Sequence, residues 1–319
     1  MKPPYTITPE IIKLVASISE KTGRIKAAHL QKSPTELRKK NRIKTIQSSL
    51  AIEGNTLSLD QVTAILENKR ILAPAKDILE VKNAIQVYNK LLSFSPFSLT
   101  DICKAHRLLM SGLIPDAGKL RTQNVGIAKG KKVTHIGPKP VMIKGLMKDL
   151  LEYIKNDNEL MLIKSCVFHY EFEFIHPFMD GNGRMGRLWQ TILLTNYSKV
   201  FEFLPVESII KEKQKYYYLA LSSSDKQGNS TPFIVFMLEV IDEALKVILS
   251  SQNISIPPNM RIEIFKEYIG KESFTRQVYL NYFKEVSTAT ASRDLKQAVD
   301  NKLLSKRGDK SLTTYLFKK

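Results

Sequence analysis

Apolar residues recur at helical spacing along most of the chain, and this pattern predicts a largely helical protein. Over residues 8–25, isoleucine and valine lie three or four positions apart behind a Thr-Pro-Glu start that is typical of a helix N-terminus. Segments with the same period follow, separated by turn-forming sequences such as SPFS and LIPDAG. They cover residues 59–69, 76–93, 98–112, 141–155, 159–175 and 184–197. We therefore expect the middle of the chain to form a helical bundle.

A short helix is expected after the basic stretch LRKKNRIK, residues 37–44. Apolar positions in the following sequence share one face, and Gly54-Asn55 supplies residues that commonly end a helix. The prediction is a helix over about residues 44–54 that carries Glu53 at its end.

Two stretches break the helical pattern. Residues 125–140 carry a Lys-Gly turn between β-branched residues and end in two prolines, which predicts a small β-hairpin standing off the bundle as a flap. SIPPN, residues 255–259, predicts a Pro-rich linker. We accordingly expect an N-terminal helical region over 1–95, a helical core over 96–254 and a tail domain over 255–319.

The tail has the pattern of a winged helix-turn-helix. Apolar positions from Phe274 to Phe283 predict a short helix, a turn follows at Val286-Ser287, and TATASRDLKQAVDNKLL predicts a second helix, with SKRGDKSLTTYLF as the wing hairpin. From Met260 onward there are 13 Lys or Arg and 7 Asp or Glu. This balance suits DNA contact, but it suits a protein-interaction or dimerisation domain as well.

Composition limits the class of protein. The chain has 319 residues, of which 43% are hydrophobic and 25% charged, as expected for a globular protein of about two or three domains. No apolar run has the length of a signal peptide or a membrane-spanning helix, so we expect a cytoplasmic protein without membrane contact. Cys103 and Cys166 lack metal-ligand spacing, which favours reduced, buried thiols. The net charge of +18 favours an anionic partner, but a Lys-rich composition also explains it.

The stretch HPFMDGNGRMGR, residues 176–187, concentrates one His, one Asp, three Gly and two Arg. Its GNGRMG part matches a dinucleotide-binding pattern, but that fold needs the first glycine at the end of a strand, and Pro177 stands in the way. The preceding segment, 159–175, has the period of a buried helix instead, and a proline ends a helix at the residue before it. The motif therefore lies in a turn between two helices.

Such a turn has the chemistry of a polyphosphate site. The backbone N–H groups of Gly181, Asn182 and Gly183 at a helix N-terminus form an anion cradle. Arg184 and Arg187, three positions apart, share one face of the following helix. Each feature alone is usually structural, an ordinary turn or a solvated face. Their coincidence within one short stretch favours a nucleotide site.

The same stretch resembles the signature of the Fic family, H-x-F-x-[DE]-G-N-G-R-x-x-R, and matches every specified position. The resemblance extends through GKLRTQNVGI, the flap and YYYLAL, over roughly residues 8–250. It implies a mainly α protein, with a Fic-type helical bundle and a small β-hairpin flap before the winged helix-turn-helix-like tail. The implied activity is adenylyl transfer: AMP passes from ATP to a Ser, Thr or Tyr hydroxyl of a protein, and pyrophosphate leaves.

The resemblance also implies roles for individual residues. His176 would act as general base on the incoming hydroxyl, which suits a group with an ordinary pKa near neutrality. Asp180 would hold a Mg²⁺ ion together with phosphate oxygens. The cradle would stabilise the transferred phosphate, the arginines would bind the outer phosphates, and a tyrosine would face the nucleotide. This set comprises Gly181, Asn182, Gly183, Arg184, Arg187, Tyr217 and Tyr218.

Upstream, SSLAIEG resembles the Fic inhibitory motif [ST]-x-x-x-E-[GN], with Ser49, Glu53 and Gly54 as the matching positions. The pattern alone is common by chance. Upstream of a full Fic motif, it implies that Glu53 pairs with Arg187 and competes with the γ-phosphate of ATP for the same guanidinium. The enzyme would then be inhibited by its own N-terminal region.

Two other functions stay open from the sequence. One is a DNA-binding regulator that uses the Fic core as a nucleotide sensor, although a sensor needs no general base such as His176. The other is removal of AMP, with Glu53 orienting a hydrolytic water. The partners considered are a protein target with a hydroxyl residue, the protein itself as target, a second copy in a homodimer, and DNA at the tail.

Overall fold

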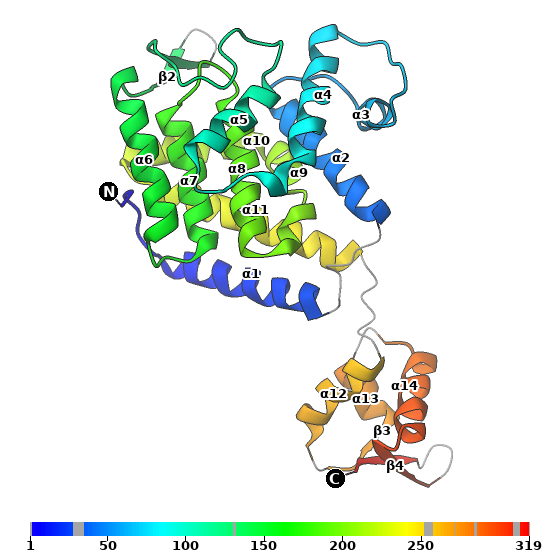
Figure 1. Cartoon of the computed structure of the whole chain (residues 1–319). Helices are drawn as coiled ribbons and strands as arrows, with labels where there is room; N and C mark the ends of the chain where they lie inside the picture. Colours follow the sequence, from blue (N-terminus) through cyan, green and yellow to red (C-terminus); the bar gives the residue numbers. More distant parts are fainter. Residues whose placement is uncertain are drawn as a thin grey trace. The chain divides into compact units, whose positions relative to one another are not determined.

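Helices dominate the structure, which confirms the predicted mainly α class (Figure 1). The computed structural model describes residues 2–27, 35–129, 132–251, 258–270, 272–283, 286–308 and 313–318. They fall into two compact units, Met1–Leu249 and Ser250–Lys319. No helix within these described ranges is long and apolar enough to cross a membrane. The centre of the predicted Lys-Gly turn and most of the predicted linker lie outside the described residues.

The larger unit is a helical bundle. Its helices are α1 (Pro9–Ala27), α2 (Thr35–Ile52), α3 (Leu59–Leu66), α4 (Ala75–Asn89), α5 (Leu99–Leu109), α6 (Pro140–Asn156), α7 (Met161–Ile175), α8 (Asn182–Tyr197), α9 (Val206–Glu212), α10 (Gln214–Gln227) and α11 (Thr231–Ser251), with short 3₁₀ turns η2 (Leu91–Ser93) and η3 (Lys199–Phe203). Between α5 and α6, strands β1 (Gly126–Lys129) and β2 (Lys132–Ile136) pair antiparallel, as the hairpin prediction requires.

α7 and α8 form the centre of this bundle. Most α7 side chains are buried, including the polar Lys164 and His169, so the helix has little amphipathic pattern. α8 packs along α7, and its Trp189 is fully buried against Phe94 near the start of α5. In Figure 1, α6, α7 and α8 stand side by side, and α1 crosses below them. The turn that joins the two central helices is the motif singled out in the sequence.

The helix before Glu53 is longer than the sequence suggested. We expected it over about residues 44–54, but α2 begins at Thr35 and ends at Ile52, so the basic stretch is helical and Glu53 lies in the following turn. Tertiary contacts on one face explain the difference. Asn41 is buried and donates a hydrogen bond from Nδ2 to the Phe203 carbonyl at 3.0 Å. Lys and Arg on the other face are good helix formers and stay in water.

The smaller unit combines three helices with a small sheet. The helices are α12 (Pro258–Ile269), α13 (Arg276–Tyr282) and α14 (Thr288–Asp300), and the strands are β3 (Phe274–Thr275), β4 (Leu304–Arg307) and β5 (Thr314–Phe317), in sheet order β3-β5-β4. We expected Phe274 in the first helix of the tail, but it lies in strand β3. The helix begins later because the Thr275 side chain caps α13 by accepting a hydrogen bond from Val278 N. This element order is the one expected for a winged helix-turn-helix. That assignment stays a prediction for the smaller unit.

A buried ion pair joins the helices of the smaller unit. Arg261 of α12 binds Asp294 of α14 through Nε to Oδ2 at 2.6 Å and Nη2 to Oδ1 at 2.8 Å. The Tyr279 hydroxyl of α13 donates to the same carboxylate at 3.2 Å. All three helices thus share one buried carboxylate, and loss of either charge would leave the other unpaired in the core.

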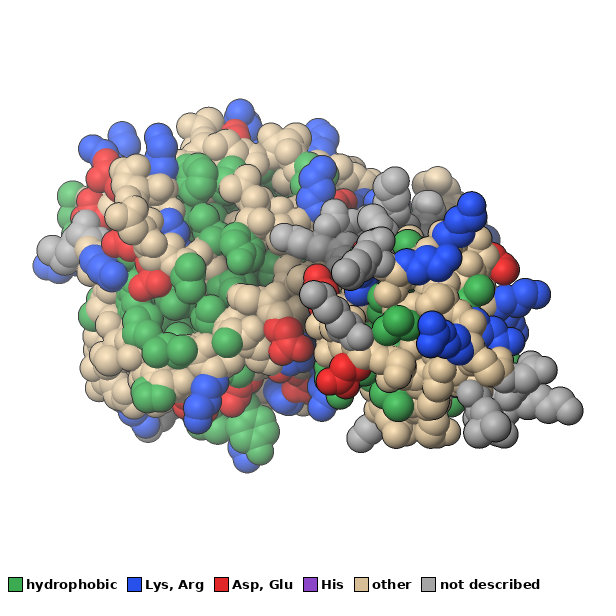
Figure 2. Space-filling view, turned by 90° about the horizontal axis from the view of Figure 1, so that it is seen from below, with side chains coloured by type: hydrophobic (Ala, Val, Ile, Leu, Met, Phe, Trp, Pro, Cys, Tyr) green, Lys and Arg blue, Asp and Glu red, His purple; other side chains and the backbone are tan. Residues whose placement is uncertain are grey.

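The two units differ in the character of their visible surface. In Figure 2, apolar side chains gather on the face of the larger unit, whereas Lys and Arg side chains stand out over the smaller unit. Exposed basic residues of the smaller unit include Arg276, Arg293, Lys296 and Lys306. The smaller unit therefore has the surface charge that an anionic partner would require.

Candidate active site

Two left-handed residues shape the turn between α7 and α8. His176 follows the end of α7 with φ 50° and ψ 61°, and Pro177 prevents the helix from continuing. Gly181 precedes α8 with φ 84°, and a Cβ there would lie 2.7 Å from the Met110 sulfur. The sequence therefore needs a glycine at this position both for backbone conformation and for space.

The Asn182 side chain closes the turn onto itself. Its Nδ2 donates to the Phe178 carbonyl at 2.9 Å, and its Oδ1 accepts from the Phe178 N–H at 2.9 Å. The Asn182 amide group is thereby used to hold the loop. Its predicted part in binding phosphate would come from its backbone N–H at the start of α8.

His106 of α5 packs against the turn and holds it by a hydrogen bond, a role that the sequence did not predict. Its ring stacks on the Phe178 ring at 3.7 Å between centroids. Gly118 N donates to Nδ1 at 2.8 Å, so Nε2 carries the proton and donates to the Asp180 carbonyl at 2.9 Å. Burial lowers the pKa of His106 to about 4, so the ring is neutral near pH 7. A lone histidine on a helix has no sequence pattern that would reveal this role.

Arg121 connects the turn with the base of the hairpin. Its Nε donates to the His176 carbonyl at 2.7 Å, and its backbone N–H donates to the Pro177 carbonyl at 2.9 Å. Its Nη2 donates to the Pro138 carbonyl at 2.7 Å and its Nη1 to the Gln123 carbonyl at 2.8 Å. The GKLRTQNVGI segment resembles Fic proteins in sequence, but that resemblance assigned no role to Arg121.

His176 is half-buried at the mouth of the turn, and its hydrogen bond determines its tautomer. Nδ1 lies 3.3 Å from the Glu173 carbonyl oxygen. Because a carbonyl can only accept, this contact requires the proton on Nδ1 and leaves the lone pair on Nε2. A neutral imidazole in this form can take a proton at Nε2.

Arg187 is held by the end of α2. Its Nε donates to Ser49 Oγ at 3.1 Å, and its Nη2 donates to the Ser49 carbonyl at 2.9 Å and to Glu53 Oε1 at 2.7 Å. The buried Nη1 has no hydrogen-bond partner among the described residues. Burial lowers the pKa of Arg187, but the Glu53 carboxylate, Tyr217 and Glu173 together outweigh it, so the pKa is raised. The structure thus brings together Glu53 and Arg187, as the two motifs implied, and adds Ser49 as a further partner.

Gly183 leaves room for the Glu53 carboxylate. A Cβ at Gly183 would lie 2.5 Å from Glu53 Oε1 and 3.3 Å from Glu173 Oε1. Glu53 therefore sits against the first turn of α8, where the helix dipole and free N–H groups favour an anion.

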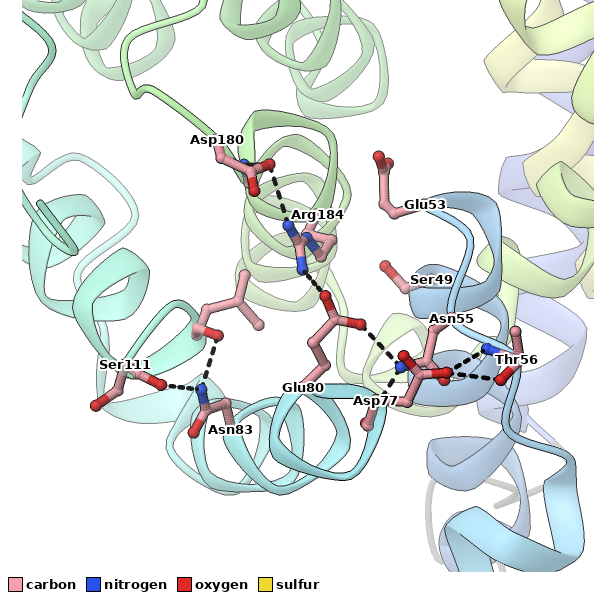
Figure 3. Close-up of polar contacts among 12 residues, drawn as sticks. Ser49, Glu53, Asn55, Thr56, Asp77, Glu80, Asn83, Ser111, Asp180 and Arg184 are labelled. Atoms are coloured by element: carbon pink, nitrogen blue, oxygen red, sulfur yellow. Dashed lines mark hydrogen bonds and ion pairs between the residues drawn. The ribbon is translucent and has the colours of Figure 1, made fainter. Parts of the chain in front are cut away.

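Asp180 and Arg184 form a second charged group beside the turn (Figure 3). Asp180 Oδ1 accepts hydrogen bonds from Gly181 N at 2.6 Å and from Arg184 Nη2 at 3.2 Å. The Asp180 side chain is 57% exposed, whereas that of Arg184 is 6% exposed. Arg184 Nη1 also pairs with Glu80 Oε1 of α4 at 3.1 Å, a partner that the sequence did not suggest.

A cavity of about 850 Å³, large enough for a nucleotide, lies beside the turn between α7 and α8. From the predicted set, the lining includes His176, Asp180, Gly181, Asn182, Gly183, Arg187, Tyr217, Tyr218 and Glu53, but not Ser49, Gly54 or Arg184. Tyr170, Phe174, Leu219 and Leu221 also line the cavity, as do Val125 and Gly126 at the base of the hairpin. The cavity lining thus combines the anion cradle with aromatic and apolar side chains.

The two predicted tyrosines differ in their contacts. Tyr217 is 1% exposed, and its hydroxyl lies 3.0 Å from His169 Nε2. Tyr218 is 38% exposed at the cavity wall. The side chain with room to contact a ligand is therefore that of Tyr218, while Tyr217 packs the wall.

Comparisons with known proteins agree with this geometry. A sequence profile of the Fic/DOC family matches residues 96–194. A Fic family protein from Desulfovibrio desulfuricans G20 has a crystal structure similar to this one, with a TM-score of 0.76 and 38% sequence identity over 100% of this chain and 98% of that one. The chain belongs to the Fic/DOC family.

Other relatives of this Fic protein carry a functional name. Protein adenylyltransferase fic-1 of Caenorhabditis elegans is 32% identical over 225 residues, which cover 66% of this chain and 42% of that protein. Protein adenylyltransferase Fic of Nematostella vectensis is 30% identical over 221 residues, which cover 66% of this chain and 49% of that protein. This chain therefore spans less than half the length of the curated relatives it matches.

Proposed function

We propose that this Fic protein is a protein adenylyltransferase that inhibits itself through Glu53. The names of its relatives support the activity, and a motif from His176 to Arg187 that has most of its specified residues along one cavity supports it independently. ATP would be the substrate, with the triphosphate at the start of α8 and the base against aromatic and apolar residues of the lining. The acceptor would be a Ser, Thr or Tyr hydroxyl of a protein, with the chain itself among the candidate targets.

In this reaction the acceptor oxygen forms a bond to the α-phosphorus of ATP. The bond from that phosphorus to the oxygen bridging to the β-phosphate breaks, and pyrophosphate leaves. His176 Nε2 takes the proton of the hydroxyl, a step typically worth about 10²–10⁴-fold in rate. The N–H groups at the start of α8 stabilise the charge that develops on the α-phosphate oxygens. Tyr218 would contact the nucleotide from the cavity wall.

Asp180 is the residue that fits a Mg²⁺ ion. Its exposed carboxylate borders the cavity beside the cradle, and magnesium usually takes only one or two protein carboxylates together with phosphate oxygens. Among the described residues, no group of three or more His, Cys, Asp or Glu side chains could hold a metal ion. The ion would neutralise phosphate charge and orient the leaving group.

The observation that carries self-inhibition is the 2.7 Å contact between Arg187 Nη2 and Glu53 Oε1. An arginine can bind a carboxylate or a phosphate through the same nitrogens. While Glu53 occupies Nη2, the γ-phosphate of ATP cannot use it, so the bound nucleotide lacks the contact that would align it.

An adduct measurement tests the activity. Purified protein is incubated with α-labelled ATP and Mg²⁺, and mass spectrometry detects an AMP adduct on the protein itself or on proteins of a cell extract. We expect the Glu53→Gly variant to form the adduct, and His176→Ala in that background to bind ATP but form none. Adduct formation at an unchanged rate without His176 would contradict the assigned general base.

We further infer that the smaller unit contacts DNA through α14. The exposed side of α14 carries Thr288, Arg293, Lys296 and Gln297, groups that bind phosphates and base edges. The opposite side is fixed by the buried Arg261 to Asp294 pair. A rigid helix with a basic polar face beside a short hairpin suits the major groove.

A further inference from the structure

Glu80 of α4 holds two residues that lie on different elements of the site. Its Oε1 accepts from Arg184 Nη1 at 3.1 Å, and its Oε2 accepts from Asn55 Nδ2 at 2.8 Å. The side chains of Glu80 and Arg184 are 9% and 6% exposed, so the ion pair is largely withdrawn from water. Figure 3 shows this carboxylate between the chain after α2 and the first turn of α8.

Asn55 fixes the chain directly after Glu53 and Gly54. Its backbone N–H donates to the Leu50 carbonyl at 3.1 Å, and its Oδ1 accepts from Leu57 N at 3.1 Å. Gly54 has φ 94°, so the backbone turns sharply between the inhibitory carboxylate and the asparagine. The position of Glu53 therefore depends on where Asn55 is held, and Glu80 is the charged group that holds it.

Arg184 depends on Glu80 for its orientation. Its Nη2 donates to Asp180 Oδ1 at 3.2 Å, and its buried Nε has no hydrogen-bond partner among the described residues. A buried guanidinium without its counter-charge is strongly unfavourable. Without Glu80, Arg184 would turn fully to Asp180 and withdraw both itself and that carboxylate from ATP and its metal ion.

We infer that Glu80 is a positioning residue that serves both states of the site. Through Asn55 it keeps Glu53 at Arg187, and through Arg184 it holds a guanidinium at Asp180, whose carboxylate borders the cavity. This inference rests on the proposed transferase function. It extends that function because neither the catalytic motif nor the inhibitory motif contains Glu80 or Asn55.

The first experiment separates the Asn55 contact from general stability. Asn83 provides a matched control, since it is a buried asparagine on α4 that donates from Nδ2 to the Leu109 and Ser111 carbonyls, away from α2 (Figure 3). Asn55→Ala removes the side-chain hydrogen bonds to Glu80, to the Asp77 carbonyl and to Leu57 N. It should raise the rate of AMP transfer by at least about tenfold, the effect expected from the bond to the charged group alone. Asn83→Ala should transfer at the wild-type rate. Equal rates for the two variants would show that the Asn55 contact does not stabilise the inhibited state.

The gain must also act through Glu53. Asn55→Ala combined with Glu53→Gly should be no faster than Glu53→Gly alone, because the anchor has nothing left to hold. A merely structural effect of Asn55 would persist in that background. Full additivity of the two gains would therefore contradict the inference.

The second experiment tests the contact to Arg184. In the Glu53→Gly background, Glu80→Gln keeps the side-chain volume but leaves one acceptor oxygen for two donors. We expect the KM for ATP to rise by about tenfold and the Mg²⁺ concentration for half-maximal transfer to rise with it, while kcat changes less. An unchanged KM and an unchanged Mg²⁺ dependence would show that Glu80 does not position Arg184.

A measurement without catalysis distinguishes failure of this inference from failure of the proposed function. Amide hydrogen exchange of residues 50–57 should be faster in Asn55→Ala than in the wild type, and unchanged in Asn83→Ala. Exchange that is equal in all three proteins overturns the anchoring role, whatever the activity. If Glu53→Gly transfers no AMP but this exchange pattern is found, the proposed function fails and the anchoring of residues 50–57 through Asn55 stands.

Discussion

Arg187 of this Fic protein has two competing partners, a carboxylate of its own chain and a phosphate of the proposed ligand. Arg187 is 2% exposed and binds Ser49 and Glu53 of the N-terminal region, yet its guanidinium faces the cavity where phosphates would bind. Desolvation makes a buried arginine require an anion, so whichever anion is present is bound strongly. The choice between Glu53 and a phosphate is therefore a competition for one charge.

Glu207 of α9 provides a residue-scale prediction for stability. It is 1% exposed, and burial raises its pKa to about 7 from an ordinary value of 4.5. The native state then binds its proton more tightly than the unfolded chain, so stability falls as pH rises from about 4.5 to about 7. Glu207→Gln should gain up to about 3 kcal/mol over the wild type at pH 8 and little at pH 4.5. Urea unfolding at both pH values measures this, and a gain that is the same at both would contradict it.

At the scale of elements, the site depends on segments that are far apart in the sequence. α2, α4, α5 and the segment before the hairpin each contribute one support to the turn between α7 and α8: Ser49, Glu80, His106 and Arg121. The turn itself contains little that could hold it in shape besides Asn182. Preorganisation of the cradle is therefore a property of the bundle.

Arg121 allows a direct test of this support. Arg121→Lys keeps the charge but loses the planar fork that reaches the His176, Pro138 and Gln123 carbonyls. In the Glu53→Gly background we expect kcat to fall by at least about tenfold, because the general base would be misplaced. Arg24→Lys, at an exposed position of α1, is the control and should have no effect. Equal rates for the two variants would show that the turn does not need Arg121.

An element could be predicted from the sequence where the interactions that form it are local along the chain. The helical period and the turn chemistry around Gly181 act locally, so the bundle, the hairpin and the position of the motif could be predicted. The early start of α2 could not, because burial of Asn41 against Phe203 supports it from elsewhere in the chain. Glu80 and His106 were missed for the same reason. Each is a single polar residue on a helix, and only the fold shows what it touches.

At the scale of the whole molecule, the chain consists of two units with separate cores. The larger core surrounds α7 and α8, and the smaller one is formed around Phe265 and the buried Arg261 to Asp294 pair. A unit with its own apolar cluster and buried ion pair can fold alone. The proposed transferase chemistry and the proposed DNA contact thus belong to different units.

The smaller unit should fold and bind DNA as a fragment of residues 258–319. We expect cooperative thermal unfolding, and a log affinity for duplex DNA that falls with log salt with a slope of about −0.9 for each phosphate contact. Lys296→Ala on α14 should reduce that slope by about one contact, whereas Lys266→Ala on the exposed side of α12 should leave it unchanged. No binding at low salt would favour the protein-interaction alternative.

The most direct test of self-inhibition compares AMP transfer rates in a cycle of Glu53→Gly and Arg187→Ala at saturating ATP and Mg²⁺. Removing the Glu53 carboxylate frees Arg187 for the γ-phosphate, and each 1.4 kcal/mol by which the inhibited state was favoured appears as about tenfold in rate. We predict that Glu53→Gly gains at least about tenfold, and that the double variant stays slow because the phosphate contact is gone. No gain from Glu53→Gly, or an equal gain in the Arg187→Ala background, would contradict inhibition through this ion pair.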